Sequence, residues 1–172
     1  MRFVGSCYRA HDPRWAFKPL SGDGAAVHGG RFNPKGLPAL YLALSSVGAV
    51  KEANQGFAHK IDPCTLCSYD VDCENIADLS DAEILSDFGI APSELACAWA
   101  IIAAGGKEPP SWKIARRLIG DGHAGIIVPS LAKAAAPDER NLVLWRWSNA
   151  LPHRVSVNDP SGKLPKNQLS WD

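Results

Sequence analysis

The stretch HGGRFNPKGLPALYLALSSVGAVKE, residues 28–52, contains the first switch in this chain from loop to strand to helix. Its glycine pair and prolines are typical of a turn-rich loop, and the apolar run 39–44 predicts a short buried strand after it. A helix is expected next. Arg31, Tyr41 and Glu52 therefore fall on three successive elements, so that an anion-binding side chain, an aromatic ring and a carboxylate follow one another.

These three side chains together suit a ligand with phosphates, an aromatic ring and a sugar whose glycosidic carbon becomes cationic. A guanidinium group binds phosphate with a fork of donors. A carboxylate can bind a ribose hydroxyl and stabilise positive charge at C1′. A nicotinamide dinucleotide is such a ligand. A Rossmann site for it is disfavoured, because no G-x-G-x-x-G stands between a strand and a helix.

Outward from this stretch, strands gather near both ends of the chain and helices in the middle. The periodicity predicts strands at residues 2–10, 39–44, 65–71, 124–128, 142–147 and 154–157. It predicts helices at residues 93–104 and 112–119, and a capping-box pattern from Ser80 to Glu83 opens a short helix that Gly89 can end. Residues 11–35 read as a long connection. This order favours an α+β fold over a doubly wound sheet.

The helix after residue 45 can be capped by Ser45 or Ser46. Glu52 lies off the apolar stripe of this helix and need not be buried in the core. The residues expected to form that stripe, at helical spacing, are Val47, Val50, Ala53 and Phe57.

Composition fits one globular domain without a membrane span. The 172 residues are 46% hydrophobic and 21% charged, and 18 basic residues balance 18 acidic ones. Zero net charge argues against a protein that coats nucleic acid or an anionic membrane. No apolar run reaches the roughly 18 residues of a membrane span, and the N-terminus lacks the features of a signal peptide, so we expect a cytoplasmic protein.

The five cysteines do not form a complete metal-binding pattern. Cys64 and Cys67 make a C-x-x-C, with Cys73 close behind and His59 before it. A structural zinc site needs four ligands at suitable spacing, and no second C-x-x-C or H-x-x-x-H follows. We therefore predict no metal and interpret these residues as reduced thiols that line a strand.

Taken singly, each residue of the opening stretch also has an ordinary interpretation. Arg31 could be a surface arginine in a turn. Tyr41 could be a core tyrosine with a satisfied hydroxyl. Glu52 could be a solvated helix glutamate. The functional interpretation gives Arg31 the phosphates, Tyr41 the nicotinamide ring and Glu52 the reacting ribose.

Three further residues could line the same site. Arg9, at the end of the first strand, could be a second phosphate clamp or an edge salt bridge. Ser130 could donate to a phosphate or ribose oxygen, or could cap a helix over residues 131–135. No G-x-S-x-G surrounds it, which disfavours a hydrolase nucleophile. His28 adjoins the glycine loop and could line the site or be a solvated loop histidine.

In combination, these residues make the chain resemble the RES-domain family of toxins from Xre–RES toxin–antitoxin systems. The family takes its name from an arginine, a glutamate and a serine, matched here by Arg31 in GGRFNPKG, Glu52 in AVKEAN and Ser130 in IIVPSLA. Further matches are Tyr8-Arg9, Leu40-Tyr41-Leu42-Ala43 and Asn141-Leu142-Val143-Leu144. Phe32 departs from the tryptophan that the family commonly has after the arginine. The resemblance spans residues 1–157, and residues 158–172 form a C-terminal tail outside it.

The resemblance implies an ADP-ribosyltransferase-like fold, with a split, mixed β core surrounded by helices. It implies a type II toxin that consumes NAD⁺ as substrate, with no resident cofactor, and that a cognate Xre-like helix-turn-helix antitoxin blocks. Catalysis then falls to Glu52, Arg31 and Tyr41, and NAD⁺ binding to Arg9, Arg31, Tyr41, Ser130 and His28. A protein is the first choice as acceptor of ADP-ribose.

Other functions remain open at the level of sequence. Water or phosphate as acceptor would make the chain an NAD⁺ glycohydrolase or phosphorylase. A toxin that targets RNA is disfavoured by the zero net charge and the lack of paired histidines. A non-catalytic module that only binds an antitoxin would leave Glu52 without a chemical role.

Overall fold

The computed structural model describes residues 1–54, 61–133 and 135–169. Its strands are β1 (Phe3–His11), β2 (Leu40–Ala43), β3 (Thr65–Cys73), β4 (Ile76–Asp78), β5 (Gly125–Pro129), β6 (Arg140–Leu144) and β7 (His153–Val157). They form one seven-stranded sheet in the order β4-β5-β6-β2-β1-β3-β7. The β4–β5 pair is parallel, and the other neighbours are antiparallel. The predicted α+β class with a mixed sheet is confirmed.

The sheet is split between β1 and β2. β1 pairs with β3 along its whole length, from Phe3 to His11. Within the described residues, its pairing with β2 is limited to Tyr8 opposite Ala43. The sheet therefore consists of one half made of β4, β5, β6 and β2 and another made of β1, β3 and β7. The expected split β core is present, and the gap lies beside Arg9 and Tyr41.

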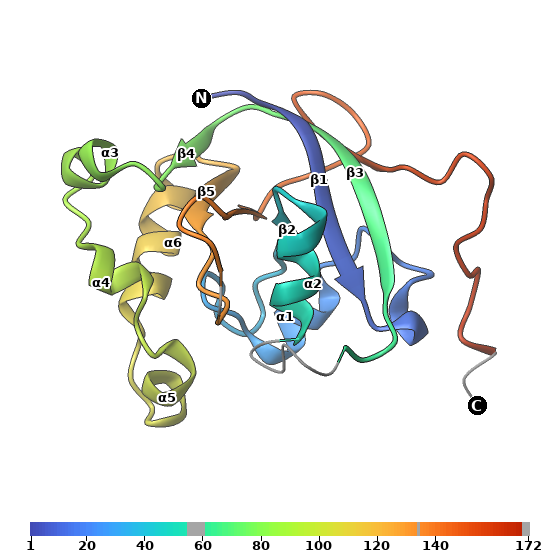
Figure 1. Ribbon diagram of the computed structural model, residues 1–172. Coiled ribbons are helices and arrows are strands. Elements are labelled where there is room, and N and C mark those ends of the chain that lie inside the picture. The colour runs from blue at the N-terminus through green and yellow to red at the C-terminus, as the bar shows by residue number, and fades with distance from the viewer. Residues whose placement is uncertain (55–60, 134, 170–172) are drawn as a thin grey trace.

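Short helices surround this sheet. They are α1 (Asp23–His28), α2 (Ser46–Asn54), α3 (Ala82–Asp87), α4 (Pro92–Leu95), α5 (Trp99–Ala104) and α6 (Pro110–Gly120), with a 3₁₀ turn at Pro13–Trp15. In Figure 1, α3 to α6 gather beside β4 and β5, whereas α1 and α2 lie near the middle of the molecule. None of the described helices is long and apolar enough to cross a membrane.

Two apolar clusters hold the sheet to its surroundings. The first includes Ile126, Val128 and Val143 of the sheet together with Leu85, Leu95, Ile114 and Leu118 of α3, α4 and α6. The second is built from alternate residues of the strands, including Cys7, Leu40, Leu42, Cys67, Tyr69, Val71, Cys73, Leu142 and Leu144. Successive strand residues point to opposite faces, so the same strands supply both clusters.

The predicted buried stripe of α2 is wrong. Val47 is 61% exposed and Ala53 is exposed as well, whereas Gly48 and Ala49 face the interior. At Gly48 a Cβ would lie 2.9 Å from the Ser45 Oγ, so a larger residue would force a shift there. α2 buries its smallest residues because it packs close to the sheet. Phe57 lies outside the described residues.

The prediction of one helix over residues 93–104 is also wrong, because α4 ends at Leu95 and a second helix, α5, begins at Trp99. The carbonyls of Leu95 and Cys97 accept hydrogen bonds from Arg31 at this break. An arginine 64 residues away in sequence thus satisfies carbonyls that a continuous helix would use internally.

Several boundaries differ from the sequence expectations. The helix predicted from the Ser80 capping pattern forms as α3, but its N-cap is Asp81, whose carboxylate accepts from two backbone amides. The connection 11–35 contains α1. β6 ends at Leu144 because the next two amides, of Trp145 and Arg146, both turn to the carbonyl of Ala124.

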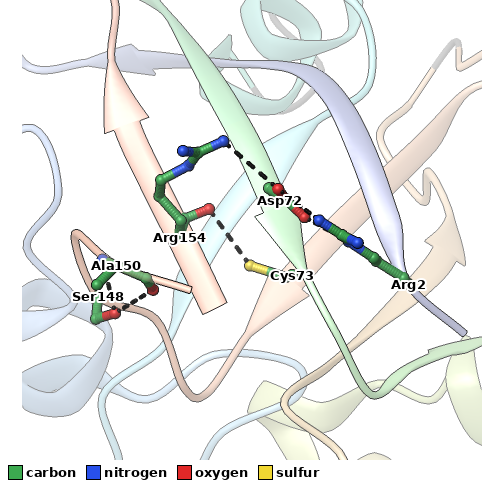
Figure 2. A network of polar contacts seen from close by, with 6 residues as sticks. All are labelled: Arg2, Asp72, Cys73, Ser148, Ala150 and Arg154. Atoms are coloured by element: carbon green, nitrogen blue, oxygen red, sulfur yellow. Dashed lines mark hydrogen bonds and ion pairs between the residues drawn. The ribbon is translucent and has the colours of Figure 1, made fainter. Parts of the chain in front are cut away.

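The half made of β1, β3 and β7 is joined by ionic contacts as well as by its ladders (Figure 2). Arg2 Nε lies 2.7 Å from Asp72 Oδ1, and Arg154 Nη2 lies 3.4 Å from Asp72 Oδ2. The hydrogen bond from Arg2 lowers the pKa of Asp72. The Cys73 thiol donates to the Arg154 carbonyl. These contacts lie on the half of the sheet that ends in β7.

Candidate functional site

A cavity of about 680 Å³ opens at the split in the sheet, where residues of β1, β2, β5 and β6 line it. Its wall includes Tyr41 of β2, Asn141 and Val143 of β6 and Glu52 of α2. Pro129 of β5 and Trp99 of α5 also line it, and the neighbouring loops complete it with Gly29, Gly30, Arg31, Phe32, Leu131, Ala132 and Lys133. The structure thus brings Arg31, Tyr41 and Glu52 to the same cavity.

Glu52 is held by two donors that reach the same oxygen. Ser130 Oγ donates to Glu52 Oε1 at 2.6 Å. Asn141 Nδ2 donates to that oxygen at 2.5 Å. Among the described residues Oε2 has no hydrogen-bond partner, so one carboxylate oxygen is fixed and the other is available to a ligand.

Arg31 combines a structural contact with a place on the cavity wall. Its Nη1 donates to the carbonyls of Leu95 at 3.2 Å and Cys97 at 2.6 Å. The guanidinium group has five N–H donors, so a single nitrogen used in this way leaves donors for an anion. Arg31 therefore holds the segment just before α5, whose Trp99 lines the cavity, and lines the same cavity itself.

Tyr41 has the satisfied hydroxyl of a core tyrosine and also lines the cavity. Its hydroxyl donates to Asn33 Oδ1 at 2.7 Å and accepts from the Phe32 amide at 3.0 Å. Burial raises the pKa of Tyr41, so the hydroxyl stays protonated. The ring nevertheless lines the cavity. A satisfied hydroxyl fixes the ring, and a fixed ring can serve as a stacking surface.

Arg9 stands at the gap between the sheet halves. It lines the main cavity and a smaller one of about 240 Å³, which it shares with Tyr8, Tyr41, Glu52 and Asn141. Arg9 Nη1 donates to the Ser21 carbonyl at 3.2 Å. Burial lowers the pKa of Arg9. The guanidinium group is thus partly removed from water beside the cavity, where an anionic group would compensate its charge.

Ser130 and His28 occupy different surroundings. Ser130 follows β5, and its hydroxyl is directed to Glu52 while it also accepts from the Ala132 amide at 3.4 Å. The described residues after it form no helix for it to cap. His28 is the exposed last residue of α1 and is not among the residues that line the main cavity.

The glycine loop is shaped by indole donors that sequence reasoning did not assign. Trp112 Nε1 donates to the Gly30 carbonyl at 2.8 Å, and Trp145 Nε1 donates to the Phe32 carbonyl at 2.8 Å. Asn33 is fully buried and donates to the carbonyls of Ala25, Pro34 and Leu37. A Cβ at Gly30 would lie 2.6 Å from the Tyr41 hydroxyl, so this close approach requires glycine.

Asn141 and Lys133 are site residues that the sequence did not single out for chemistry. Asn141 belongs to a strand that resembles the family, but its contact with Glu52 joins residues 89 apart, which no local pattern reveals. Lys133 adds a cation to the cavity wall. In the sequence, the feature that could have pointed to Lys133 is its position three residues after Ser130.

Within the described parts of the chain, no group of three or more histidine, cysteine or acidic side chains could hold a metal ion. His59 lies outside those parts. All five cysteines are free, and Cys7, Cys67 and Cys73 are buried along β1 and β3. Burial raises the pKa of Cys7 to about 12 and that of Cys73 to about 11. These protonated thiols behave as small apolar residues of the core.

Comparison with known proteins identifies the family. The family model described as the RES domain matches residues 6–171. The chain belongs to the RES-domain family. Its structure is similar to a chain of the crystal structure of the M. tuberculosis MbcT–MbcA toxin–antitoxin complex, with a TM-score of 0.62 and 20% identity over 92% of this chain and 84% of that chain. A search of the curated proteins finds no similar sequence.

The three residues that carry the family resemblance lie close together in this RES domain. Of the arginine, glutamate and serine that carry the resemblance, Glu52 and Ser130 are hydrogen-bonded to each other. Arg31 lies with Glu52 on the wall of the main cavity. At 20% identity, the comparison with the MbcT–MbcA structure shows a shared fold over 92% of this chain.

Proposed function

We propose that this RES domain cleaves the nicotinamide–ribose bond of NAD⁺ and transfers the ADP-ribose to a cellular protein, as the toxin of a type II toxin–antitoxin system. The observation that carries the proposal is the convergence of Glu52, Arg31 and Tyr41 on one cavity of about 680 Å³. A volume of this size falls in the range of small-molecule and cofactor sites.

In the proposed mechanism, Arg31 binds the pyrophosphate, with Arg9 as a second cation. The ring of Tyr41 packs against nicotinamide. The bond between ribose C1′ and the pyridinium nitrogen breaks, and its electron pair leaves with neutral nicotinamide. Glu52 Oε2 faces the ribose and stabilises the positive charge that develops at C1′. A nucleophile then forms the new bond to C1′ and loses its proton.

Nicotinamide leaves as a neutral molecule, so the reaction needs no strong general acid. The proposed mechanism uses Glu52 as the carboxylate beside C1′, and the hydrogen bonds from Ser130 and Asn141 hold its Oε1 in place. The work left to the protein is to hold the ribose beside this charge and to position the acceptor.

The acceptor decides the name of the reaction. A protein side chain gives an ADP-ribosyltransferase, phosphate an NAD⁺ phosphorylase and water a glycohydrolase. We favour a protein because a site that holds an activated ribose can transfer it to any nucleophile that reaches C1′. The two alternatives use the same cleavage step and differ only in that nucleophile.

A partner that blocks the cavity would regulate such an enzyme. The similar chain belongs to a toxin–antitoxin complex, which supports the proposal of an antitoxin for this chain. We propose a cognate antitoxin with an Xre-like helix-turn-helix region that obstructs access to Arg31 and Glu52. The proposal requires no direct contact between this chain and nucleic acid.

The experiment that tests the function is release of nicotinamide from NAD⁺ by the purified protein. Parallel reactions contain no acceptor, inorganic phosphate or a cell lysate as the source of proteins. Labelled protein, ADP-ribose 1″-phosphate and free ADP-ribose report transfer, phosphorolysis and hydrolysis, respectively. The variants are Glu52→Ala and Arg31→Ala, with the exposed Glu83→Ala and Arg14→Ala as matched controls.

We expect nicotinamide release by the wild type and by both controls, and its loss in folded Glu52→Ala and Arg31→Ala. A folded wild type that releases no nicotinamide under any of these conditions contradicts the proposal. Degradation of RNA in the lysate by the wild type and by Glu52→Ala alike would favour an RNA-targeting toxin. Antitoxin binding with no activity would favour a non-catalytic module.

A further inference from the structure

Asn141 occupies a position from which it can direct Glu52. It lies on β6, between β2 and β5, opposite Ala43 on one side and Val128 on the other. A residue in the interior of the sheet has little freedom of movement. Glu52, in contrast, lies near the end of the short helix α2. The contact between Asn141 Nδ2 and Glu52 Oε1 therefore ties a helix side chain to the rigid sheet.

The chemistry of the two groups fixes the direction of this bond. An ionised carboxylate only accepts hydrogen bonds, so Asn141 must present its NH₂ group to Glu52. Its Oδ1 is then turned away, and it is buried without a partner among the described residues. A buried acceptor without a partner lowers the stability of the fold, a cost that an apolar side chain would not incur.

The arrangement of donors around Glu52 is one-sided. Ser130 and Asn141 both reach Oε1, and they come from β6 and from the segment directly after β5. Two bonds from neighbouring strands to one oxygen set the rotation of the carboxylate as well as its position. Oε2 has no such partner among the described residues, and Glu52 and Asn141 line both cavities.

We propose that Asn141 is a positioning residue for Glu52, which acts with Ser130 to hold Oε1 so that Oε2 faces the ribose of the substrate. This role rests on the proposed cleavage of NAD⁺ and adds to it a residue that does not itself contact the reacting atoms. The unpaired Oδ1 means that asparagine at this position is unfavourable for the fold, and the benefit lies in the orientation of Glu52.

The first test replaces Asn141 by leucine, which has a similar size and needs no hydrogen bond. We expect kcat for nicotinamide release to fall roughly 100-fold, as misplacement of a reacting group does. KM should stay within a few-fold, and Tm should stay equal or rise. Asn158→Leu, the same change at an exposed position, is the control and should keep wild-type kcat. A folded Asn141→Leu protein with wild-type kcat overturns the proposal.

Asn141→Asp provides a second variant in case leucine prevents folding. It keeps the shape but replaces the donor by an acceptor against Glu52 Oε1. Two carboxylates at this distance share a proton, so activity should become dependent on pH in a range where the wild type is level. An unchanged kcat and an unchanged pH profile would overturn the proposal.

NMR of the protein without substrate separates this proposal from the proposed function. The side-chain amide protons of Asn141 should resonate downfield in the wild type because one of them is bonded to a carboxylate. Glu52→Ala should move them to the ordinary range. If Glu52→Ala leaves them unchanged, the contact is absent and the positioning role fails. If the contact is present but wild-type protein releases no nicotinamide, the proposed function fails and the contact stands.

Discussion

Two asparagines near the cavity differ in how their polar atoms are satisfied. Asn33 is fully buried, donates to three carbonyls and accepts from the Tyr41 hydroxyl. Asn141 makes one side-chain hydrogen bond, to Glu52, and its Oδ1 is buried without a partner among the described residues. A residue whose every polar atom is paired serves the fold. A buried polar atom without a partner calls for an explanation, and for Asn141 the contact with Glu52 supplies one.

The same contrast extends to the regions around these residues. The connection between β1 and β2 is held by donors from β3, from the segment after β6 and from β1. Tyr69, Trp147 and Arg9 reach the carbonyls of Pro19, Leu20 and Ser21 in succession. The region around Glu52 contains a second unpaired atom, Glu139 Oε2, beside the ion pair of Glu139 with Lys51. Substitutions in the first region should lower stability, and those in the second should lower activity.

Arg31 belongs to both regions, so its removal should have the largest effect. Arg31→Ala is expected to lower kcat/KM for nicotinamide release roughly 100- to 1000-fold, because an anion contact is lost. It should also lower the free energy of unfolding by about 1–2 kcal/mol, because the carbonyls of Leu95 and Cys97 lose their donor. Steady-state kinetics and urea unfolding measure the two effects. Arg14→Ala is the control, and a loss of stability without loss of activity would place Arg31 in the structural region alone.

Asn33→Ala should give the largest loss of stability in the loop region. The substitution removes the buried donor to the carbonyls of Ala25, Pro34 and Leu37, and it leaves the Tyr41 hydroxyl without its acceptor. We expect the free energy of unfolding to fall by roughly 3 kcal/mol or more. Urea unfolding measures it, with the exposed Asn158→Ala as control. A stability equal to the control would remove the contrast between the two asparagines.

His11 should make the loop region sensitive to acid. Burial and the charge of Arg9 lower its pKa from 6.5 to about 4. The unfolded chain therefore binds more protons between these values, and stability is complete above pH 6.5 and decreases as the pH falls toward 4. The loss amounts to roughly 3 kcal/mol. Urea unfolding at several pH values measures it, and His11→Gln should lack this part of the pH dependence. Parallel pH profiles for the two proteins would contradict the prediction.

Trp145→Phe should have the smallest of these effects. The indole Nε1 donates to the Phe32 carbonyl in the interior, and phenylalanine cannot replace that bond. We expect a loss of about 1–2 kcal/mol in the free energy of unfolding. Trp15→Phe changes an indole that is 56% exposed and should have little effect. Equal stabilities of the two variants in urea would show that the indole bond does not hold the glycine loop.

Local patterns predicted the elements whose residues decide their own structure. Strands β1, β2, β3, β5, β6 and β7 and helices α2, α3 and α6 follow from periodicity and from end signals. The face that α2 buries did not follow, because Gly48 and Ala49 face the interior in place of the larger apolar residues, and a Cβ at Gly48 would lie 2.9 Å from the Ser45 Oγ. The break between α4 and α5 depends on Arg31, which lies far away in sequence.

The site could be predicted only in part, because some of its contacts are local in sequence and others are not. Arg31, Tyr41 and Glu52 are close in sequence on a loop, a strand and a helix that fold back together, so their convergence could be expected. Asn141 and the indoles of Trp112 and Trp145 reach the site across 82 to 113 residues. No spacing rule links residues so far apart. Ser130 was a candidate from the sequence, but its contact with Glu52, which spans 78 residues, was not predicted.

The most direct test of the account measures nicotinamide release and unfolding on the same samples of wild-type protein and Glu52→Gln. Glutamine keeps the size of the side chain and removes the negative charge that the proposed mechanism needs at C1′. We predict a rate that falls roughly 1000-fold, with a free energy of unfolding within about 1 kcal/mol of the wild type. Release of nicotinamide by Glu52→Gln at the wild-type rate, or no release by folded wild-type protein, would contradict the account.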